Sequence, residues 1–166
     1  MVFKLAWGKN GTPDTLGSAG DDLDITDLTA KKFNQFLFHG LVTGAGSGRG
    51  NETFNNNTNS VYAQRSSNNG AADATYTSQA TWFHDNQNDD EFKIIYLCSI
   101  SGEEKLGIYF HVYYGAAGAG AAPIREEFVG KFVPSPDADI TRIDINNDVA
   151  SFDFDTSSNL SALGTD

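Results

Sequence analysis

Two apolar segments, EFKIIYLCSI at residues 91–100 and KLGIYFHVYY at residues 105–114, decide the fold of this chain. Each is long enough for one strand and is rich in aromatic and β-branched side chains, which favour a β-sheet. The residues between them, Ser101-Gly102-Glu103-Glu104, are typical of a turn. The pair therefore predicts an antiparallel hairpin.

The faces of this hairpin depend on its register. A two-residue or a four-residue symmetric loop places Ile100 opposite Lys105 and Phe92 opposite Tyr113. A three-residue loop would shift the pairing by one residue and exchange the faces. We predict the first register, which gives a core face made of Ile95, Leu97, Leu106, Ile108, Phe110 and Val112.

In that register the second face is also mostly apolar. Five of its side chains form the predicted contact surface: Phe92, Tyr96, Tyr109, His111 and Tyr113. Their combined apolar area exceeds the roughly 300–600 Å² of a typical monomer's largest patch, so something must cover them. The cover could be another segment of the chain, a neighbouring subunit or a sugar-like ligand.

Turn signals separate further strand-like segments along the rest of the chain. They lie at residues 2–7, 31–43, 52–55, 60–66, 73–83, 124–133, 140–145, 149–154 and 159–163. No stretch shows the apolar period of an amphipathic helix. About ten short strands predict one all-β domain over residues 1–166, a jelly-roll-like β-sandwich. We expect a flexible N-terminal segment and a Gly/Ala arm at residues 115–122.

Composition excludes several classes of function. Asp and Glu number 22 against 11 Lys and Arg, and the net charge of −11 disfavours nucleic acid. No run approaches the ~18 apolar residues of a membrane-spanning helix, and the first residues turn polar too quickly for a secretory signal. The single cysteine, Cys98, excludes a disulfide framework and a cysteine metal cluster.

Residues that could carry chemistry form no recognisable motif. The histidines are His39, His84 and His111, and no Gly-x-Ser-x-Gly elbow accompanies them. We interpret the neighbours His84 and Asp85 as a loop coincidence, and His111 as a core or interface histidine. The acidic run Asp89-Asp90-Glu91 could hold a hard cation, but a solvated loop is the simpler interpretation. We expect no catalytic residues, no cofactor and no bound metal.

A carbohydrate-binding module is the alternative function. Exposed tryptophan rings stack on sugars, and Asp and Asn side chains bind hydroxyl groups. The possible ligand loop consists of Trp82, Asp85, Asn86 and Asn88, with Trp7 as a second stacking ring. A glycoside hydrolase is a third hypothesis, which requires a cleft with two carboxylates about 5–9.5 Å apart.

The order of several segments resembles a known group of proteins. These segments are LGSAGDDLD (16–24), KKF (31–33), FNNNTNSVYAQR (54–65), NGAADAT (69–75), GAGAAPIR (118–125), GKF (130–132), ITRID (140–144) and residues 155–164. From about Leu16 to Gly164 the chain resembles uncharacterised β-rich virion proteins of tailed bacteriophages, mostly known from environmental sequences. The resembling motifs are not catalytic signatures.

The resemblance implies a non-enzymatic structural component of a phage particle, such as a capsid decoration, tail or fibre protein. It implies assembly in the host cytoplasm and location in the virion. The expected partners are further copies of this chain, as a homotrimer, and other virion proteins. We expect no nucleic acid and no membrane as partners, and a glycan is a possible ligand.

Overall fold

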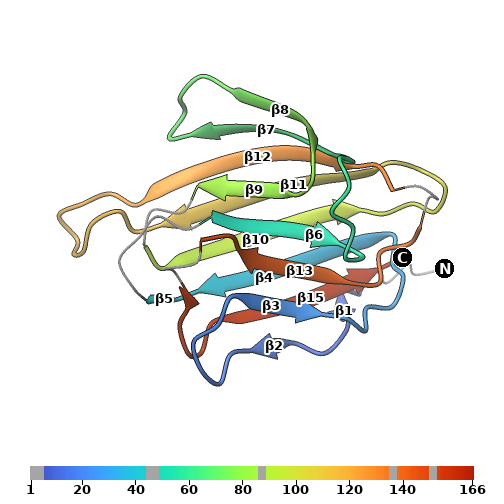
Figure 1. The fold of residues 1–166 in the computed structure, drawn as a ribbon, viewed down its shortest axis with the longest axis horizontal. Coiled ribbons are helices and arrows are strands. Elements are labelled where there is room, and N and C mark those ends of the chain that lie inside the picture. Colours follow the sequence, from blue (N-terminus) through green and yellow to red (C-terminus); the bar gives the residue numbers. More distant parts are fainter. Residues whose placement is uncertain (1–5, 44–48, 86–88, 135–137, 150–152) are drawn as a thin grey trace.

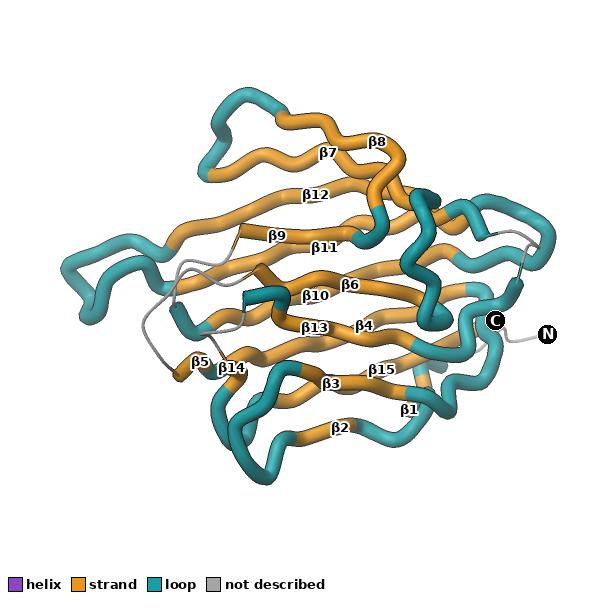
Figure 2. The backbone as a smooth tube through the Cα atoms, viewed as in Figure 1, coloured by secondary structure: helices purple, strands orange, loops and turns teal. Residues whose placement is uncertain are grey.

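The fold is all-β, as described by a computed structural model for residues 6–43, 49–85, 89–134, 138–149 and 153–166. Most strands belong to one nine-stranded antiparallel sheet (Figures 1 and 2). Its main path is, in spatial order, β1 (Gly8–Lys9), β15 (Asn159–Thr165), β4 (Phe33–Gly40), β10 (Glu91–Cys98), β11 (Lys105–Tyr113), β12 (Ile124–Phe132), β7 (Tyr62–Asn68) and β8 (Ala74–Gln79). The remaining strand, β2 (Asp14–Thr15), pairs with β15.

A smaller sheet forms the second layer. Its four antiparallel strands are β3 (Asp22–Ile25), β13 (Ile143–Asn147), β6 (Arg49–Phe54) and β9 (Trp82–Asp85). In Figure 1 this sheet lies across the middle of the large one. A short pair, β5 (Val42–Thr43) with β14 (Asp153–Phe154), completes the strands of the described residues. The described residues contain no helix with the length and apolar character that a membrane crossing requires.

The core lies between the two sheets, and this arrangement confirms the predicted all-β sandwich. β4 alternates between core and surface, because Phe36 and Phe38 are buried while Phe33 and Leu37 are only partly buried. The small sheet adds apolar side chains from its inner face, such as Ile145. Aromatic rings fill the space on the β12 and β7 side, in contact with one another: Phe54, Tyr62, Trp82, Tyr109, Phe128 and Phe132.

A pair of glycines makes room for the largest of these rings. Gly107 of β11 and Gly130 of β12 are cross-strand partners. A Cβ atom added to Gly107 would lie 2.6 Å from the Trp82 ring, and one added to Gly130 would lie 2.8 Å from it. The indole therefore packs directly against the backbone of the large sheet, and its Nε1 donates a hydrogen bond to the Lys131 carbonyl oxygen.

The predicted hairpin is present, but its predicted register is wrong. Cys98 pairs with Leu106 and Glu91 pairs with Tyr113, one residue away from the predicted pairing. The alternative register therefore forms, and the faces of β11 are exchanged. Lys105, Tyr109, His111 and Tyr113 point into the core, together with Gly107, whereas the apolar row of Leu106, Ile108, Phe110 and Val112 points outward.

The turn explains this register. Gly102 adopts a φ of 78°, which a residue with a side chain rarely adopts, and Glu103 N donates to the Ile100 carbonyl oxygen. The Lys105 ammonium also donates to the Ile100 and Glu103 carbonyl oxygens at 2.6 and 2.8 Å. Lys105 is thereby buried at the end of the sandwich, which fixes the inward positions along β11.

Other predicted segments differ in extent from the observed strands. The segment 73–83 is two strands in different sheets, because the chain leaves β8 and enters the small sheet at β9. The polar stretch before residue 26 forms β3, a strand that we did not predict. Of the predicted segment 2–7, residues 2–5 lie outside the described residues, and the first strand begins at Gly8. The Gly/Ala arm at 115–122 is mostly exposed and extends past the sheet between β11 and β12 (Figure 1).

Candidate functional site

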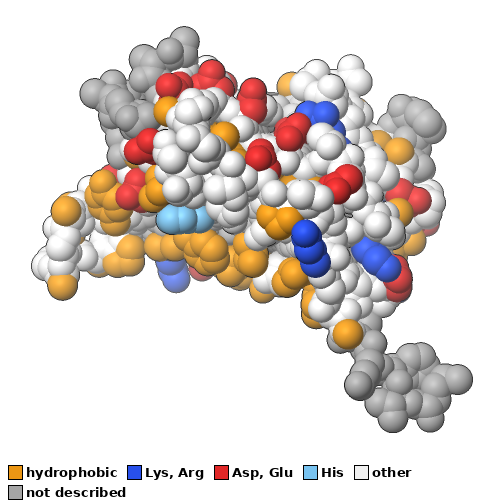
Figure 3. Space-filling view, turned by 90° about the horizontal axis from the view of Figure 1, so that it is seen from below, with side chains coloured by type: hydrophobic (Ala, Val, Ile, Leu, Met, Phe, Trp, Pro, Cys, Tyr) orange, Lys and Arg blue, Asp and Glu red, His pale blue; other side chains and the backbone are white. Residues whose placement is uncertain are grey.

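The outward side of the large sheet carries an exposed apolar surface. Seven side chains define this surface, called here the outer face: Phe92 and Tyr96 of β10, Leu106, Ile108, Phe110 and Val112 of β11, and Val129 of β12. Each is 37–58% exposed. Figure 3 shows hydrophobic side chains gathered along a hollowed edge of the molecule, with many of the visible acidic side chains away from it.

This exposure follows from the two-layer architecture. The small sheet covers the inward side of β10 and β11, and no second layer of described residues covers the outward side. A large aromatic side chain presents roughly 150–250 Å² when it is free. At their exposure of 37–58%, the seven residues together leave roughly 600 Å² of apolar area exposed. That area equals or exceeds the largest patch of a typical monomer.

The outer face is hollowed at two places. One hollow of about 270 Å³ lies between Trp7, Tyr96 and Leu106, and Cys98 also lines it. A second hollow of about 340 Å³ lies between Phe92, Phe110 and the β12 side chains. The first hollow is lined mostly by apolar residues and suits apolar side chains of a partner, whereas Arg125 and Glu127 also line the second.

Charges of both signs border this face along β12. Arg125, Glu127 and Lys131 point outward from the strand together with Val129. Arg125 lies 3.5 Å from Glu127, and Lys131 lies 3.1 Å from Glu104. The face thus has an apolar centre with a charged rim, as protein–protein interfaces do.

The structure separates the five predicted contact residues. Phe92 and Tyr96 are on the outer face and are 41% exposed. Tyr109, His111 and Tyr113 are at most 2% exposed and point into the core, because of the register shift. The prediction that these five residues form one contact surface is therefore wrong. On the exposed side of β11, apolar side chains stand where Tyr109, His111 and Tyr113 were expected.

The predicted ligand loop also does not form a stacking surface. Trp82 is completely buried beneath the glycine pair, so its ring cannot stack on a sugar. Asn86 and Asn88 lie outside the described residues, and Asp85 is the last residue of β9. Trp7 is the exposed tryptophan among the described residues, beside the first hollow of the outer face.

The inward side of the same hairpin carries a buried group of ionisable side chains, which sequence reasoning missed. Six residues from five strands form it, called here the buried cluster: Glu52 (β6), His84 (β9), Glu91 and Lys93 (β10), His111 (β11) and Glu126 (β12). None is more than 6% exposed. Perturbed, buried titratable groups of this kind are concentrated at functional sites.

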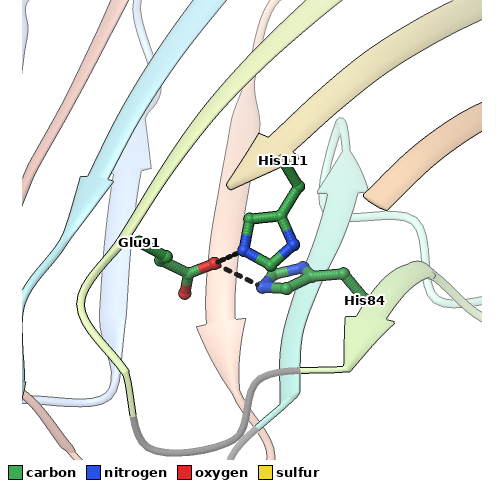
Figure 4. Close-up of side chains that lie close together, drawn as sticks. All are labelled: His84, Glu91 and His111. Carbon is green, nitrogen blue, oxygen red and sulfur yellow. Dashed lines mark ion pairs between the residues drawn. The ribbon is translucent and has the colours of Figure 1, made fainter. Parts of the chain in front are cut away.

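Carboxylates and nitrogen groups alternate through the cluster. His84 Nε2 lies 2.8 Å from Glu91 Oε2, and His111 Nε2 lies 2.6 Å from the same oxygen (Figure 4). On its other side, His84 Nδ1 lies 3.2 Å from Glu52 Oε1. The Lys93 ammonium forms an ion pair with Glu52 and lies 2.5 Å from His84 Nδ1.

Strand pairing brings these side chains together. Lys93 is opposite His111 across the β10–β11 pair, and His111 is opposite Glu126 across the β11–β12 pair. Gly50 is opposite His84 in the small sheet, and a Cβ atom on Gly50 would lie 2.1 Å from the His84 ring. The absence of that atom lets the imidazole approach the backbone of β6 closely.

The cluster shifts the pKa of its members. Burial lowers the pKa of His84 and Lys93 lowers it further, but Glu91 and Glu52 outweigh both and raise it to about 9. Burial raises the pKa of Glu91, but His84 and His111 stabilise its carboxylate and hold the pKa well below the usual value. Within these ion pairs, Glu91 is a carboxylate and His84 an imidazolium.

One signal of this cluster was present in the sequence. Glu91 and Lys93 occupy alternate positions of β10 and share a face with Ile95 and Leu97. Charged residues on a strand's apolar face predict buried ion pairs once the register is known. The partners come from other strands far along the chain, so their identity depends on the fold.

Two comparisons with known proteins gave no match. A scan against protein-family models gave no match, and a search of curated proteins gave no match either. The functional interpretation therefore depends on the geometry of the outer face and of the buried cluster.

Proposed function

We propose that this protein is a non-enzymatic structural subunit that assembles with copies of itself through the outer face. The observation that carries the proposal is the continuous exposed apolar surface over β10, β11 and β12. Its roughly 600 Å² approaches the ~800 Å² that each partner contributes to an interface of standard size. Flanking residues such as Trp7 and Tyr114 add to this area.

The charge pattern favours a second copy as the occupant. The chain has a net charge of −11, but the centre of the outer face has no charged side chain. At its rim, Arg125 and Glu127 have opposite charges and neighbouring positions on one strand. In a two-fold contact each surface meets its own copy, so Arg125 of one chain can face Glu127 of the other.

A virion is the setting that we propose for this assembly. The resemblance between Leu16 and Gly164 supports a capsid decoration, tail or fibre protein of a tailed phage. The exposed arm at 115–122 extends beyond the sheet, where it can contact a neighbouring subunit or another virion protein. Negative-stain images of the purified protein would then show particles of defined symmetry.

The mass in solution tests the assembly. Light scattering coupled to size exclusion at micromolar concentration should give two or three times the 17.9 kDa of one chain. Phe110→Lys places a charge in the centre of the outer face and should give a folded monomer. Thr58→Lys, in the exposed connection after β6, adds the same charge outside this face and should leave the mass unchanged.

A second measurement does not depend on the variants. Cys98 is the single cysteine and lines a hollow of the outer face. Its thiol should react more slowly with a maleimide as the concentration of the wild-type protein rises, because assembly covers it. A wild-type monomer whose thiol reactivity does not depend on concentration would contradict the proposal.

One observation supports carbohydrate binding as an alternative: the exposed Trp7 ring lies beside an apolar hollow. Binding on a glycan array that Trp7→Ala abolishes would favour this alternative. Silence on the array, together with an oligomeric mass, would favour assembly.

A further inference from the structure

Three side chains of the buried cluster converge like the ligands of a metal ion. His84, Glu91 and His111 each direct one potential ligand atom to a common point, with these atoms within 4.8 Å of one another. The close-up in Figure 4 shows both imidazoles pointing to one carboxylate oxygen. Two histidines and one carboxylate are a ligand set that binds zinc and related transition metals.

The far side of each imidazole faces a further carboxylate. His84 Nδ1 lies 3.2 Å from Glu52 Oε1, and His111 Nδ1 lies 3.5 Å from Glu126 Oε2. Metal-binding histidines generally donate their other ring N–H to a carboxylate or carbonyl, which fixes the tautomer that leaves Nε2 free to bind. Both histidines have a carboxylate near that nitrogen, and at His84 the Lys93 ammonium lies closer still, 2.5 Å from Nδ1.

His111 shows that the cluster is incomplete as a hydrogen-bonded network. Its side chain is fully buried, but neither ring nitrogen has a hydrogen bond of acceptable geometry among the described residues. Glu126 Oε2 also has none. Buried polar atoms in native proteins nearly always have such a partner, so the unsatisfied Nε2 atom of His111 points to a missing group on the side of the ring that faces His84 and Glu91.

A divalent cation is compatible with the charges of the cluster. The carboxyl groups of Glu52, Glu91 and Glu126 surround a single ammonium, that of Lys93. A bound ion would take the place of protons on the two imidazoles, because metal ligation requires neutral imidazoles.

We propose that His84, Glu91 and His111 bind one divalent transition-metal ion, with zinc as the best match to two imidazoles and one carboxylate. Glu126 and Glu52 act as positioning residues that orient the two rings. The ion would tie β9 of the small sheet to β10 and β11 of the large one. Hard cations such as Mg²⁺ and Ca²⁺ prefer oxygen ligands and should not compete.

Metal titration of the wild-type chain tests the site. After removal of metals with a chelator, the protein should bind one Zn²⁺ per chain in calorimetry, and Co²⁺ should give the visible absorption of a protein-bound ion. Millimolar Mg²⁺ should displace neither ion. The melting temperature should rise with Zn²⁺ concentration, since an ion that binds only the folded state stabilises it.

Variants locate the site. His111→Gln and His84→Gln should abolish binding, and Glu126→Gln should weaken it by about 10- to 100-fold, as loss of a carboxylate behind a ligand does. His39→Gln is the matched control, because His39 is exposed on β4 and outside the cluster. Circular dichroism checks that each variant is folded.

Two results would overturn the proposal. One is the absence of Zn²⁺ and Co²⁺ binding by the wild-type chain at micromolar concentration, which is decisive even if the variants do not fold. The other is binding that folded His84→Gln and His111→Gln variants retain in full. In either case the six side chains form only an ion-pair network.

Discussion

Lys93 is completely buried in the middle of the sandwich, where an unpaired ammonium would be very costly. It forms an ion pair with Glu52, and it also lies over the rings of Phe38 and Tyr109 at 5.4 and 5.3 Å. The negative faces of these rings stabilise a cation. The Lys93–Glu52 pair therefore holds β10 and β6 together at the centre of the cluster.

Lys93→Met should destabilise the protein by about 3–5 kcal/mol, because it removes the ammonium that pairs with the buried Glu52 carboxylate. The double variant Glu52→Gln, Lys93→Met should recover much of this loss, since it removes both charges of the buried pair. Chemical denaturation in the presence of a chelator measures both effects. Equal destabilisation by the single and the double variant would show that packing, and not the ion pair, sets the cost.

At the scale of elements, the contact between β9 and the β11–β12 pair depends on two glycines. Gly107 and Gly130 are opposite each other, and Trp82 lies directly beneath them. Side chains there would separate the sheets at the point where the indole fills the core. Gly107 also lines the hollow of the outer face that Trp7 borders.

Gly107→Ala should destabilise the protein by about 1–3 kcal/mol, because the new methyl group would overlap the buried Trp82 ring. Gly8→Ala is the matched control, since a Cβ atom at Gly8 has no neighbour within 4 Å. Its effect should lie within about 0.5 kcal/mol. Urea denaturation followed by tryptophan fluorescence measures both, and equal stability of the two variants would contradict the close contact.

Sequence patterns located most of the long elements, since period-two alternation and turn residues are local signals. The hairpin of β10 and β11 was predicted within two residues at each end. Its register was not predicted correctly. A shift of one residue in the turn depends on the conformation of Gly102 and on burial of the Lys105 ammonium. The buried cluster was missed for the same reason, as its six members meet only in the observed register.

For the whole molecule, a high net negative charge and an uncharged outer face act in opposite directions. Two approaching copies each carry a charge of −11, so they repel at long range. At contact, burial of the apolar outer face favours association. Salt screens the charge repulsion and leaves the gain from burial of the apolar outer face largely unchanged.

Self-association should therefore strengthen as ionic strength rises from about 0.01 to about 0.1 M, where the Debye length falls from about 30 to about 10 Å. Sedimentation velocity across this range measures the dissociation constant. Weaker association at the higher salt would instead assign the contact to ion pairs at the rim, such as Arg125 with Glu127.

The sequence by itself determined the fold class, the approximate extents of the long strands β4, β10 and β11, and the pairing of β10 with β11 as a hairpin. These properties depend on residues close together along the chain. Only the tertiary structure decided which face is exposed, that Trp82 is buried, and that His84, Glu91 and His111 meet. The physical reason is that strand register and sheet packing are settled by contacts between distant segments, and a shift of one residue exchanges every side chain between core and surface.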